Sequence, residues 1–399
     1  MKASIAFALH LFAGALAAPT KSTQENKEYD VLIAPGADIP SLLTSINLQL
    51  NLDDIFATFN NSHFHGFSGP ITSQGAESLA ALDDVLAVSE VVTIHANDVR
   101  SSTPWGLQRI SQSGTVDQSG KSATDRSYTY TYSDSNLGSG VDVFVLDTGI
   151  LTSHTEFGGR ASMGYSYFPS DADGNGHGTH CAGVIGGSTV GVASNANIIG
   201  VKILEDSGSG SSSGLLAGLD YVSGKISSGA SSVGSVINMS LAFGGTSTAV
   251  ETALKKLMAA GVHAVGASGN NAADACTYSP SNMGGDNTAL NTVGAMNIGD
   301  SISSFSNTGS CVDFYAPGEG VVSAYNNGDD AYVIMSGTSM ATPHVAGLIA
   351  YYLAEDSSPK APADMKAFLK KKAASGLGTT DDKTYVAGGQ LLIANNGGN

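Results

Sequence analysis

Three residue types that together can activate a hydroxyl for nucleophilic attack stand far apart in the 399-residue sequence. Asp147 ends the apolar run "VFVLD", His177 lies in "DGNGHGTHCAG" (residues 173–183), and Ser339 lies in "SGTSMATPHVAG". A hydroxyl is a weak nucleophile until an imidazole takes its proton, and a carboxylate on the other ring nitrogen orients that imidazole. The glycines beside His177 allow close approach of the backbone to neighbouring turns and to a bound ligand. We therefore predict that Ser339 is a nucleophile, His177 its base and Asp147 the orienting acid.

Strands and helices that alternate along the chain must bring these residues together. From about residue 140, apolar runs with strand character alternate with runs of helical spacing, at residues 141–149, 197–204, 215–226, 235–241, 249–261, 262–269 and 339–355. This alternation predicts an α/β fold, a doubly wound and mostly parallel sheet with helices on both faces. Because ligand sites in such sheets gather at the carboxyl ends of the strands, "DTG" and "SGN" are expected on one edge.

Four sequence blocks in register resemble those of the subtilisin-like serine proteases, most closely the proteinase K branch. They are "VLDTGI", "DGNGHGTHCAG", "ASGNNAADA" and "SGTSMATPHVAG", and the resemblance extends over residues 98–399. It implies a secreted endopeptidase with no catalytic cofactor, and it makes His180 a structural neighbour of the base. Asn270 matches the asparagine that, with the Ser339 N–H at the start of a helix, stabilises the oxyanion. Pro343 is expected in the first turns of that helix, where few donors are required.

The resemblance also implies two edges that hold an extended peptide by main-chain hydrogen bonds. The predicted edge and pocket residues are Gly208, Ser209, Gly210, Ser240, Leu241, Ala242, Ala267, Ser268 and Gly269. Relatives usually have glycine at position 242 and often an aromatic residue at 212, where this chain has Ala242 and Ser212. A broad preference for apolar or aromatic side chains is expected, and its sharpness stays open.

Metal binding is expected at one residue only. Asp313 in "SCVDFYAPG" matches a calcium-binding aspartate of proteinase K relatives, whose other ligands are backbone carbonyls. Hard oxygen ligands suit calcium. However, the loop at residues 279–295 looks longer than in those relatives, so whether the carbonyls are in place stays open. His177 and His180 are not interpreted as zinc ligands, because the chain offers no closed tetrahedral set.

The chain contains three cysteines, Cys181, Cys276 and Cys311. In an oxidising compartment one of them lacks an intramolecular partner, and spacing alone does not choose the pair. Because Cys181 lies inside the histidine motif, we expect a bridge between Cys276 and Cys311 and a buried, unreactive Cys181.

A leader is expected before the catalytic domain. Residues 1–18 have a basic residue, a short apolar run and small residues, which is typical of a secretory signal peptide and too short to span a membrane. Residues 19–97 have mixed helical and strand patterns that predict a small α+β domain, with residues 75–97 passing from a helix into a strand at 91–94 and residues 98–111 forming a polar boundary. They resemble the family's inhibitory propeptide, which implies self-cleavage near Asn97 and Asp98. His63 and His65 would share a strand face, most simply as exposed residues and alternatively as a pH sensor.

Composition limits the partners. The 18 basic and 35 acidic residues give a net charge of −17, which repels nucleic acid and anionic membranes. The family resemblance instead implies protein and peptide substrates and the chain's own propeptide as inhibitor, and we expect a monomer. Of two glycosylation sequons, Asn60 is expected to be accessible and Asn238 to be buried.

Other classes are less consistent with the sequence. Asp147 in "DTG" and Asp206 in "DSG" imitate the two halves of an aspartic protease, but they lie too close together in the chain. An α/β-hydrolase would have G-x-S-x-G, whereas Ser339 lies in "GTSMA". An inactive secreted binding protein is the non-enzymatic alternative, and the complete set of catalytic residues disfavours it.

Overall fold

The computed structural model describes residues 26–45, 55, 57–60, 65–91, 98–229, 231–355, 358–374 and 391–398. The chain divides into two compact units, Met1–Ile94 and His95–Asn399, a division three residues before the predicted boundary between residues 97 and 98. The predicted signal peptide, His63 and Asn97 lie outside the described residues. Within the described part of the chain, no helix is long and apolar enough to cross a membrane.

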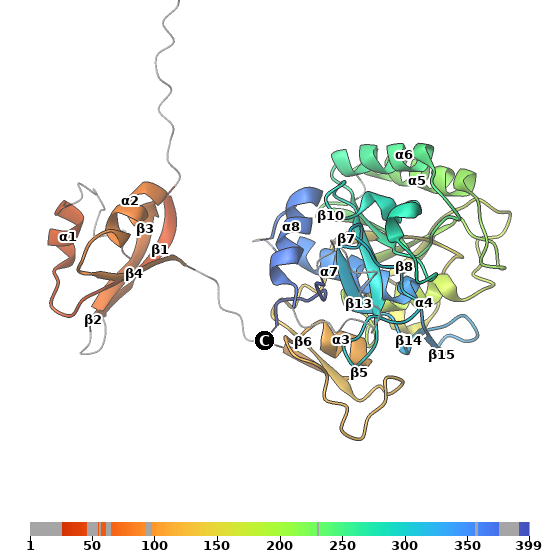
Figure 1. The fold of residues 1–399 in the computed structure, drawn as a ribbon, viewed down its shortest axis with the longest axis horizontal. Coiled ribbons are helices and arrows are strands. Elements are labelled where there is room, and N and C mark those ends of the chain that lie inside the picture. The colour runs from red at the N-terminus through yellow and green to blue at the C-terminus, as the bar shows by residue number, and fades with distance from the viewer. Residues whose placement is uncertain are drawn as a thin grey trace, which may run out of the picture. The chain divides into compact units, whose positions relative to one another are not determined.

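The smaller unit is an α+β domain, drawn in red and orange in Figure 1. Its sheet is antiparallel, in the order β2-β3-β1-β4. The elements are β1 (Asn26–Ile33), α1 (Ile39–Ser45), β2 (Ala57–Asn60), β3 (His65–Thr72), α2 (Ser73–Ala80) and β4 (Val85–Glu90). Buried side chains from the strands and from both helices, including Val31, Phe67 and Leu79, form one apolar core. Asn60 is exposed at the end of β2.

One strand of this unit starts earlier than predicted. The helix ends at Ala80 and the strand begins at Val85 rather than at residue 91. Its backbone pairs with β1, Val88 lying opposite Val31. This pairing places the strand at Val85–Glu90. The β-branched residues that follow it led the sequence prediction to place the strand too late in the chain.

The larger unit is built on a seven-stranded sheet in the order β13-β12-β11-β10-β7-β9-β8. All of its strand pairs are parallel, which confirms the predicted α/β class. The strands are β7 (Val141–Asp147), β8 (Ala161–Ser166), β9 (Asn197–Lys202), β10 (Gly234–Met239), β11 (His263–Ala267), β12 (Asn291–Met296) and β13 (Phe314–Pro317). Strands β8, β12 and β13 were not predicted, since β8 and β12 contain several small residues and β13 has only four residues.

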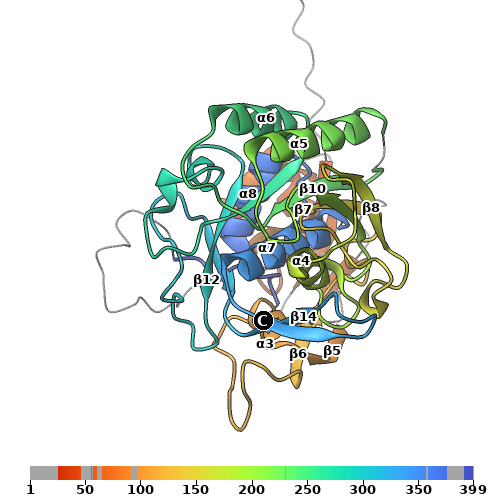
Figure 2. The same cartoon turned by 90° about the vertical axis from the view of Figure 1, so that its right-hand side faces the viewer.

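Helices cover both faces of this sheet. One face packs against α4 (His177–Gly186) and α7 (Thr338–Leu353), and the other against α5 (Ser212–Ser227) and α6 (Thr248–Ala259), which lie side by side in Figures 1 and 2. The side chains of strand β7 explain why both faces must be covered, because they alternate between two apolar cores, one on each face. Val143 and Val145 belong to the core with α4 and α7, whereas Phe144 and Leu146 belong to the core with α5 and α6.

The segment predicted as a polar boundary is part of this larger unit. It folds into β5 (Asp98–Thr103), which pairs with β6 (Tyr128–Tyr132), and into α3 (Trp105–Arg109). Trp105 is completely buried. Backbone pairing and the burial of one large ring thus outweigh the segment's polar composition.

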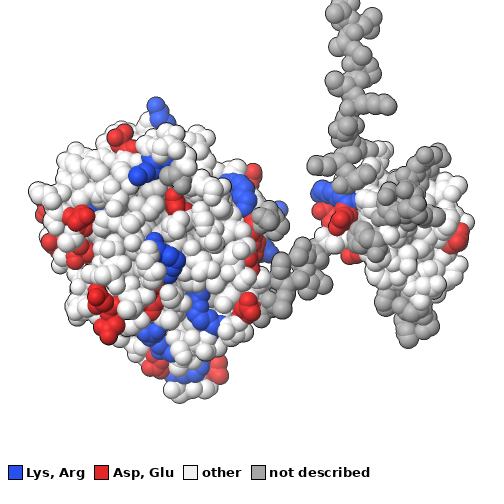
Figure 3. Space-filling model, turned by 180° about the vertical axis from the view of Figure 1, so that it is seen from behind, with Lys and Arg blue, Asp and Glu red and all other residues white. Residues whose placement is uncertain are grey.

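Smaller elements complete the unit. They are η2 (Thr155–Phe157), η3 (Ala275–Thr277), η4 (Ser281–Met283), the hairpin of β14 (Val321–Ala324) and β15 (Tyr332–Met335), and α8 (Pro362–Lys372). In Figure 3, acidic and basic side chains are interspersed over the visible face of this unit. A partner that approached this face would therefore meet charges of both signs.

Candidate active site

Asp147 and His177 form a close couple at the carboxyl edge of the sheet. Asp147 is the last residue of β7 and is fully buried, and His177 is the first residue of α4 with its side chain 20% exposed. His177 Nδ1 lies 2.8 Å from Asp147 Oδ1 and 2.9 Å from Oδ2, and Thr148 N donates to Oδ1 at 2.7 Å. Because Nδ1–H is committed to the carboxylate, Nε2 is the ring nitrogen that can accept a proton.

The two histidines of the motif have opposite electrostatic environments. Burial disfavours the charged form of His177, but the adjacent Asp147 carboxylate outweighs this and holds the pKa of His177 well above its ordinary value. Burial instead lowers the pKa of His180 to about 3, and its Nε2 lies 3.1 Å from the Val321 carbonyl oxygen. The Asp147 carboxylate therefore favours a charged His177, whereas His180 stays neutral and packs.

Ser339 is the second residue of α7 and lines the same cleft as His177. Its hydroxyl donates to the Ser240 carbonyl oxygen at 3.0 Å. Among the described residues no hydrogen bond joins this hydroxyl to His177, so the predicted contact between base and nucleophile is not formed in this structure. Catalytic hydrogen bonds are often made only when substrate is bound, and a turn about the Ser339 Cα–Cβ bond would release the hydroxyl from Ser240.

The carbonyl group of Ser339 is also held in place, and a proline makes this possible. Pro343 is the sixth residue of α7, within the first two turns as predicted, and it has no N–H to donate to the carbonyl four residues earlier. The Ser339 carbonyl oxygen instead accepts from the Ser240 hydroxyl at 2.8 Å and from the Cys181 thiol at 3.4 Å. The missing helical bond thus ties the start of α7 to β10 and α4.

Asn270 lies beside the backbone N–H of Ser339. Its Oδ1 accepts from Thr338 N at 2.8 Å and from Thr338 Oγ1 at 2.9 Å. A Cβ placed on Gly337 would lie 3.5 Å from Asn270 Nδ2 and 3.6 Å from Ser339 N. The two donors therefore border one small space, as the two donors of an oxyanion hole must.

A cleft of about 470 Å³ runs beside these groups. Its lining includes six of the nine predicted substrate residues, namely Gly208, Ser209, Gly210, Ser240, Leu241 and Ala242, together with Thr148, Asn175, His177, Ile203, Leu204, Ser211, Leu215, Phe243 and Ser339. The apolar members Ile203, Leu204, Leu215 and Phe243 were missed, because nothing in their local sequence shows that they line the cleft.

The other three predicted pocket residues lie outside this cleft's lining. Ala267 and Ser268 are buried, and Ser268 Oγ donates to the Asn307 carbonyl oxygen at 3.1 Å. Gly269 has φ +104°, and a Cβ there would lie 2.4 Å from the Asn307 side chain. These residues help to position Asn270, since they connect its loop to the segment around Asn307.

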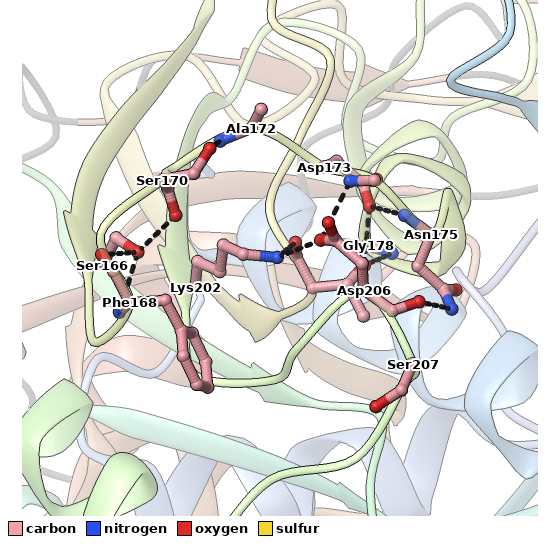
Figure 4. Close-up of polar contacts among 12 residues, drawn as sticks. Ser166, Phe168, Ser170, Ala172, Asp173, Asn175, Gly178, Lys202, Asp206 and Ser207 are labelled. Carbon is pink, nitrogen blue, oxygen red and sulfur yellow. Dashed lines mark hydrogen bonds and ion pairs between the residues drawn. The ribbon is translucent and has the colours of Figure 1, made fainter.

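A buried lysine joins three loops at the edge of the cleft (Figure 4). Lys202 Nζ donates to the Thr148 carbonyl oxygen at 2.6 Å and to Asp206 Oδ1 at 2.8 Å. Asp206 in turn accepts from Gly174 N, and its carbonyl accepts from the Asn175 side chain. The aspartate that an aspartic protease would need therefore pairs with a lysine, and the network links the loops that carry Asp147, His177 and the first substrate edge.

Asp173 organises the start of α4 in the same region. Its Oδ1 accepts from Thr148 Oγ1, Asn175 N and Gly176 N, and its Oδ2 accepts from the backbone and hydroxyl of Thr179. A carboxylate at a helix N-terminus satisfies donors that have no helical partner. Asp173 stands at the start of the histidine motif, which was the signal that could have identified it.

The residues around Asp313 do not fit a calcium ion. Asp313 is fully buried, and its Oδ1 lies 2.9 Å from Lys366 Nζ and 3.2 Å from Lys370 Nζ. Calcium takes six to eight oxygen ligands at about 2.3–2.6 Å, and an ammonium group stands where the ion would have to be. This corrects the expectation of calcium at Asp313, which the sequence resemblance had implied.

The cysteines and the buried sequon are as predicted. Cys276 and Cys311 form a disulfide with a Cα–Cα distance of 5.4 Å, and Cys181 is free and buried. Burial raises the pKa of the Cys181 thiol, so it is protonated and donates to Ser339 rather than acting as a nucleophile. Asn238 is completely buried and donates to Ser240 Oγ at 3.0 Å.

A carboxylate-oriented histidine beside a helix-start serine, at the carboxyl edge of a parallel sheet, is the arrangement of a serine hydrolase. Comparison with known proteins gives the family. Residues 138–388 match the model of the subtilase family, Peptidase S8. The chain is 40% identical over 327 residues to Proteinase R of Parengyodontium album, an alignment that covers 82% of this chain and 79% of the relative.

Two further comparisons agree. The chain is 39% identical over 372 residues to the Alkaline serine exoprotease A of Vibrio alginolyticus, covering 90% of this chain but only 63% of that relative. A crystal structure of a cold adapted subtilisin-like serine proteinase aligns with a TM-score of 0.62 and 41% identity, over 73% of this chain and 98% of the other. The chain belongs to the subtilase family and is a serine endopeptidase.

Proposed function

We propose that the protein cleaves peptide bonds through an acyl-enzyme in which Ser339 is the nucleophile. His177 Nε2 takes the hydroxyl proton and returns it to the leaving amine, while Asp147 holds the ring and stabilises the imidazolium. Water then attacks the ester by the same proton route. The observation that carries this proposal is the Asp147–His177 couple at 2.8 Å, beside a cleft that Ser339 also lines.

The oxyanion of each tetrahedral intermediate would lie between Asn270 Nδ2 and Ser339 N. Asn270 Oδ1 is already committed to Thr338, which turns the amide nitrogen toward the start of α7. The donor is thus oriented before substrate arrives and needs no rearrangement when charge develops. The N-terminal end of α7 adds a favourable dipole at the same point.

We further propose a broad preference for apolar or aromatic side chains. The cleft combines exposed backbone at Gly208, Ser209 and Gly210 with the side chains of Leu204, Leu241 and Phe243. Backbone edges bind any extended peptide, whereas apolar walls favour apolar side chains. Ser212 offers no large side chain at the rim, so the preference is expected to be broad rather than sharp.

Residues 19–97 are proposed to be an inhibitory propeptide that the enzyme removes from itself near Asn97 and Asp98. The compact unit formed by Met1–Ile94 supports this, because a domain with its own core can occupy the cleft as a folded inhibitor. With the leader at residues 1–18, we propose that the protein is secreted and acts as a monomer on proteins and peptides.

The experiment that tests this function uses the full-length chain and its Ser339→Ala variant. The natural chain should shorten to a product that begins near Asp98, react with a fluorophosphonate probe and cut apolar sites in a peptide library. The variant should stay at full length and take up no probe. Probe uptake by the variant would overturn the assignment of Ser339, and cutting confined to charged sites would overturn the proposed preference.

A further inference from the structure

The side chain of Lys366 ends in a cage of oxygen atoms formed by a different part of the chain. Its Nζ donates to the carbonyl oxygens of Gly285, Thr288 and Leu290 at 2.6, 2.9 and 2.8 Å. A lysine ammonium has three protons, and these three bonds use all of them. The fourth neighbour, Asp313 Oδ1 at 2.9 Å, is therefore held by charge rather than by a directed N–H.

The cage is buried and built by specific backbone conformations. The side chains of Lys366 and Asp313 are 7% and 0% exposed. Gly285 has φ +62°, and a Cβ there would lie 2.3 Å from the Ser310 carbonyl oxygen, so only glycine fits. That turn points the Gly285 N–H at Asp313 Oδ2 (3.1 Å) and its carbonyl at Lys366, while Thr292 N donates to the same Oδ2 at 3.0 Å.

One carboxylate and three inward-facing carbonyls are the ligands of a hard cation. We propose that the Lys366 ammonium group is a built-in cation that takes the place of a metal ion at Asp313, so that residues 284–290 keep their fold without calcium. This inference goes beyond the proposed function, because it concerns what stabilises the peptidase unit and not how it cleaves peptides. Its test is therefore independent of whether Ser339 is the nucleophile.

The Lys366 site stabilises a part of the fold that leads to Asn270. The loop leads directly into β12, and Ser268 N at the end of β11 donates to the Val293 carbonyl oxygen of that strand at 2.9 Å. Two residues further on is Asn270. A cation at this place thus stabilises the strands from which the oxyanion donor projects, and supplying it from α8 removes any dependence on free calcium.

The experiment measures thermal unfolding of the full-length chain in a Ser339→Ala background, which prevents self-digestion. Trp105 is the only tryptophan, and it is completely buried in the larger unit, so its fluorescence reports on that unit alone. The melting temperature should be the same within about 1 °C in chelator and in millimolar calcium chloride. Lys366→Met should lower it by roughly 5–10 °C, because the buried Asp313 carboxylate loses its closest cation and three buried carbonyl oxygens lose their donor.

Two variants make the test specific. Lys370→Met is the matched control, since Lys370 contacts the same Asp313 oxygen at 3.2 Å but is 27% exposed and outside the carbonyl cage, and its change should stay within about 2 °C. Lys366→Ala empties the cage, so calcium should raise its melting temperature by several degrees. A calcium-dependent gain in the natural lysine background that Asp313→Asn abolishes would overturn the proposal. So would a Lys366→Ala protein that calcium does not stabilise.

Discussion

Two buried aspartates in this molecule have nearly the same contact distance to a nitrogen partner and different consequences. Asp147 and Asp313 are both fully buried, and the partner atoms are His177 Nδ1 at 2.8 Å and Lys366 Nζ at 2.9 Å. The partners differ in exposure, 20% for His177 and 7% for Lys366. The histidine opens onto the cleft, whereas the ammonium group is enclosed by carbonyl oxygens.

The chemistry of the partner decides what each pair can do. An imidazole has a second nitrogen, so His177 can bind Asp147 and still exchange a proton with Ser339. The Lys366 ammonium has one nitrogen whose protons are all in use. Burial lowers the pKa of Lys366 and raises that of Asp313, so each charge depends on the cage. A buried aspartate can therefore take part in proton transfer when its basic partner has a second nitrogen free to exchange a proton, and its role is structural when the partner has none.

The largest expected effect comes from removing the charge of the first pair. Asp147→Asn should lower kcat by about 10⁴, the scale of the same change in another Asp–His–Ser protease, because the amide favours the wrong tautomer of His177. The pKa of His177 should fall, since the carboxylate is what raises it. The acid limb of kcat/KM, where activity is lost by protonation of His177, should then move to lower pH.

The measurement is the pH profile of cleavage of a chromogenic peptide. Variants too slow to process themselves can be cut at the junction by a trace of natural enzyme that is then inhibited and removed. Asp206→Asn is the control, because Asp206 is 63% exposed and outside the couple. A loss of less than tenfold, or an acid limb that stays in place, would contradict the assignment.

The next prediction separates the roles of the oxygen and the nitrogen of the Asn270 side-chain amide. Asn270→Asp keeps an oxygen that can accept from Thr338 but replaces the amide donor by a second oxygen. kcat should fall by about 10² to 10³, a value that comes from subtilisin, a member of the same family, and the negative charge deepens the loss. KM and the melting temperature should change little. A matching fall in stability would show that Asn270 acts mainly through Thr338.

The comparison also explains which parts could be predicted from the sequence. The Asp147–His177 couple could be predicted, because each residue lies in a motif whose neighbours serve the same chemistry. The Lys366 cage could not. Lys366 stands in "MKAFLKKK" among lysines typical of a solvated helix face, and its carbonyl partners lie 76 to 81 residues earlier in the chain. Carbonyl groups carry no signal in a sequence.

The fold, like the two buried pairs, was predicted only in part. Long apolar strands such as β7 and long helices such as α5 and α7 were identified by their periodicity. Strands β12 and β13 were missed, because their burial comes from helices and neighbouring strands rather than from a strong local pattern. Trp105 was assigned to a polar boundary for the same reason, since nothing in its vicinity reveals the core that covers it.

The smallest effect concerns a third charged pair, Lys202 and Asp206, which is intermediate between the Asp147–His177 couple at the cleft and the enclosed Asp313–Lys366 pair. The lysine is buried but its acid partner Asp206 is 63% exposed, so the ion pair itself contributes little. Lys202→Met should nevertheless raise KM about tenfold, because the Thr148 carbonyl loses a charged hydrogen bond of roughly 1.5–3 kcal/mol and the first substrate edge loses its tether. Asp206→Asn should change KM less than threefold, since an amide oxygen still accepts from Lys202.

Steady-state kinetics with a short and a long peptide would resolve this pair of variants. The long substrate reaches the edge at residues 208–210, so its KM should rise more than that of the short one, while kcat stays within about threefold. If Lys202→Met instead lowered kcat for both peptides equally, the lysine would act through the Asp147 loop. The buried charge would then belong with the catalytic couple and not with the structural cage.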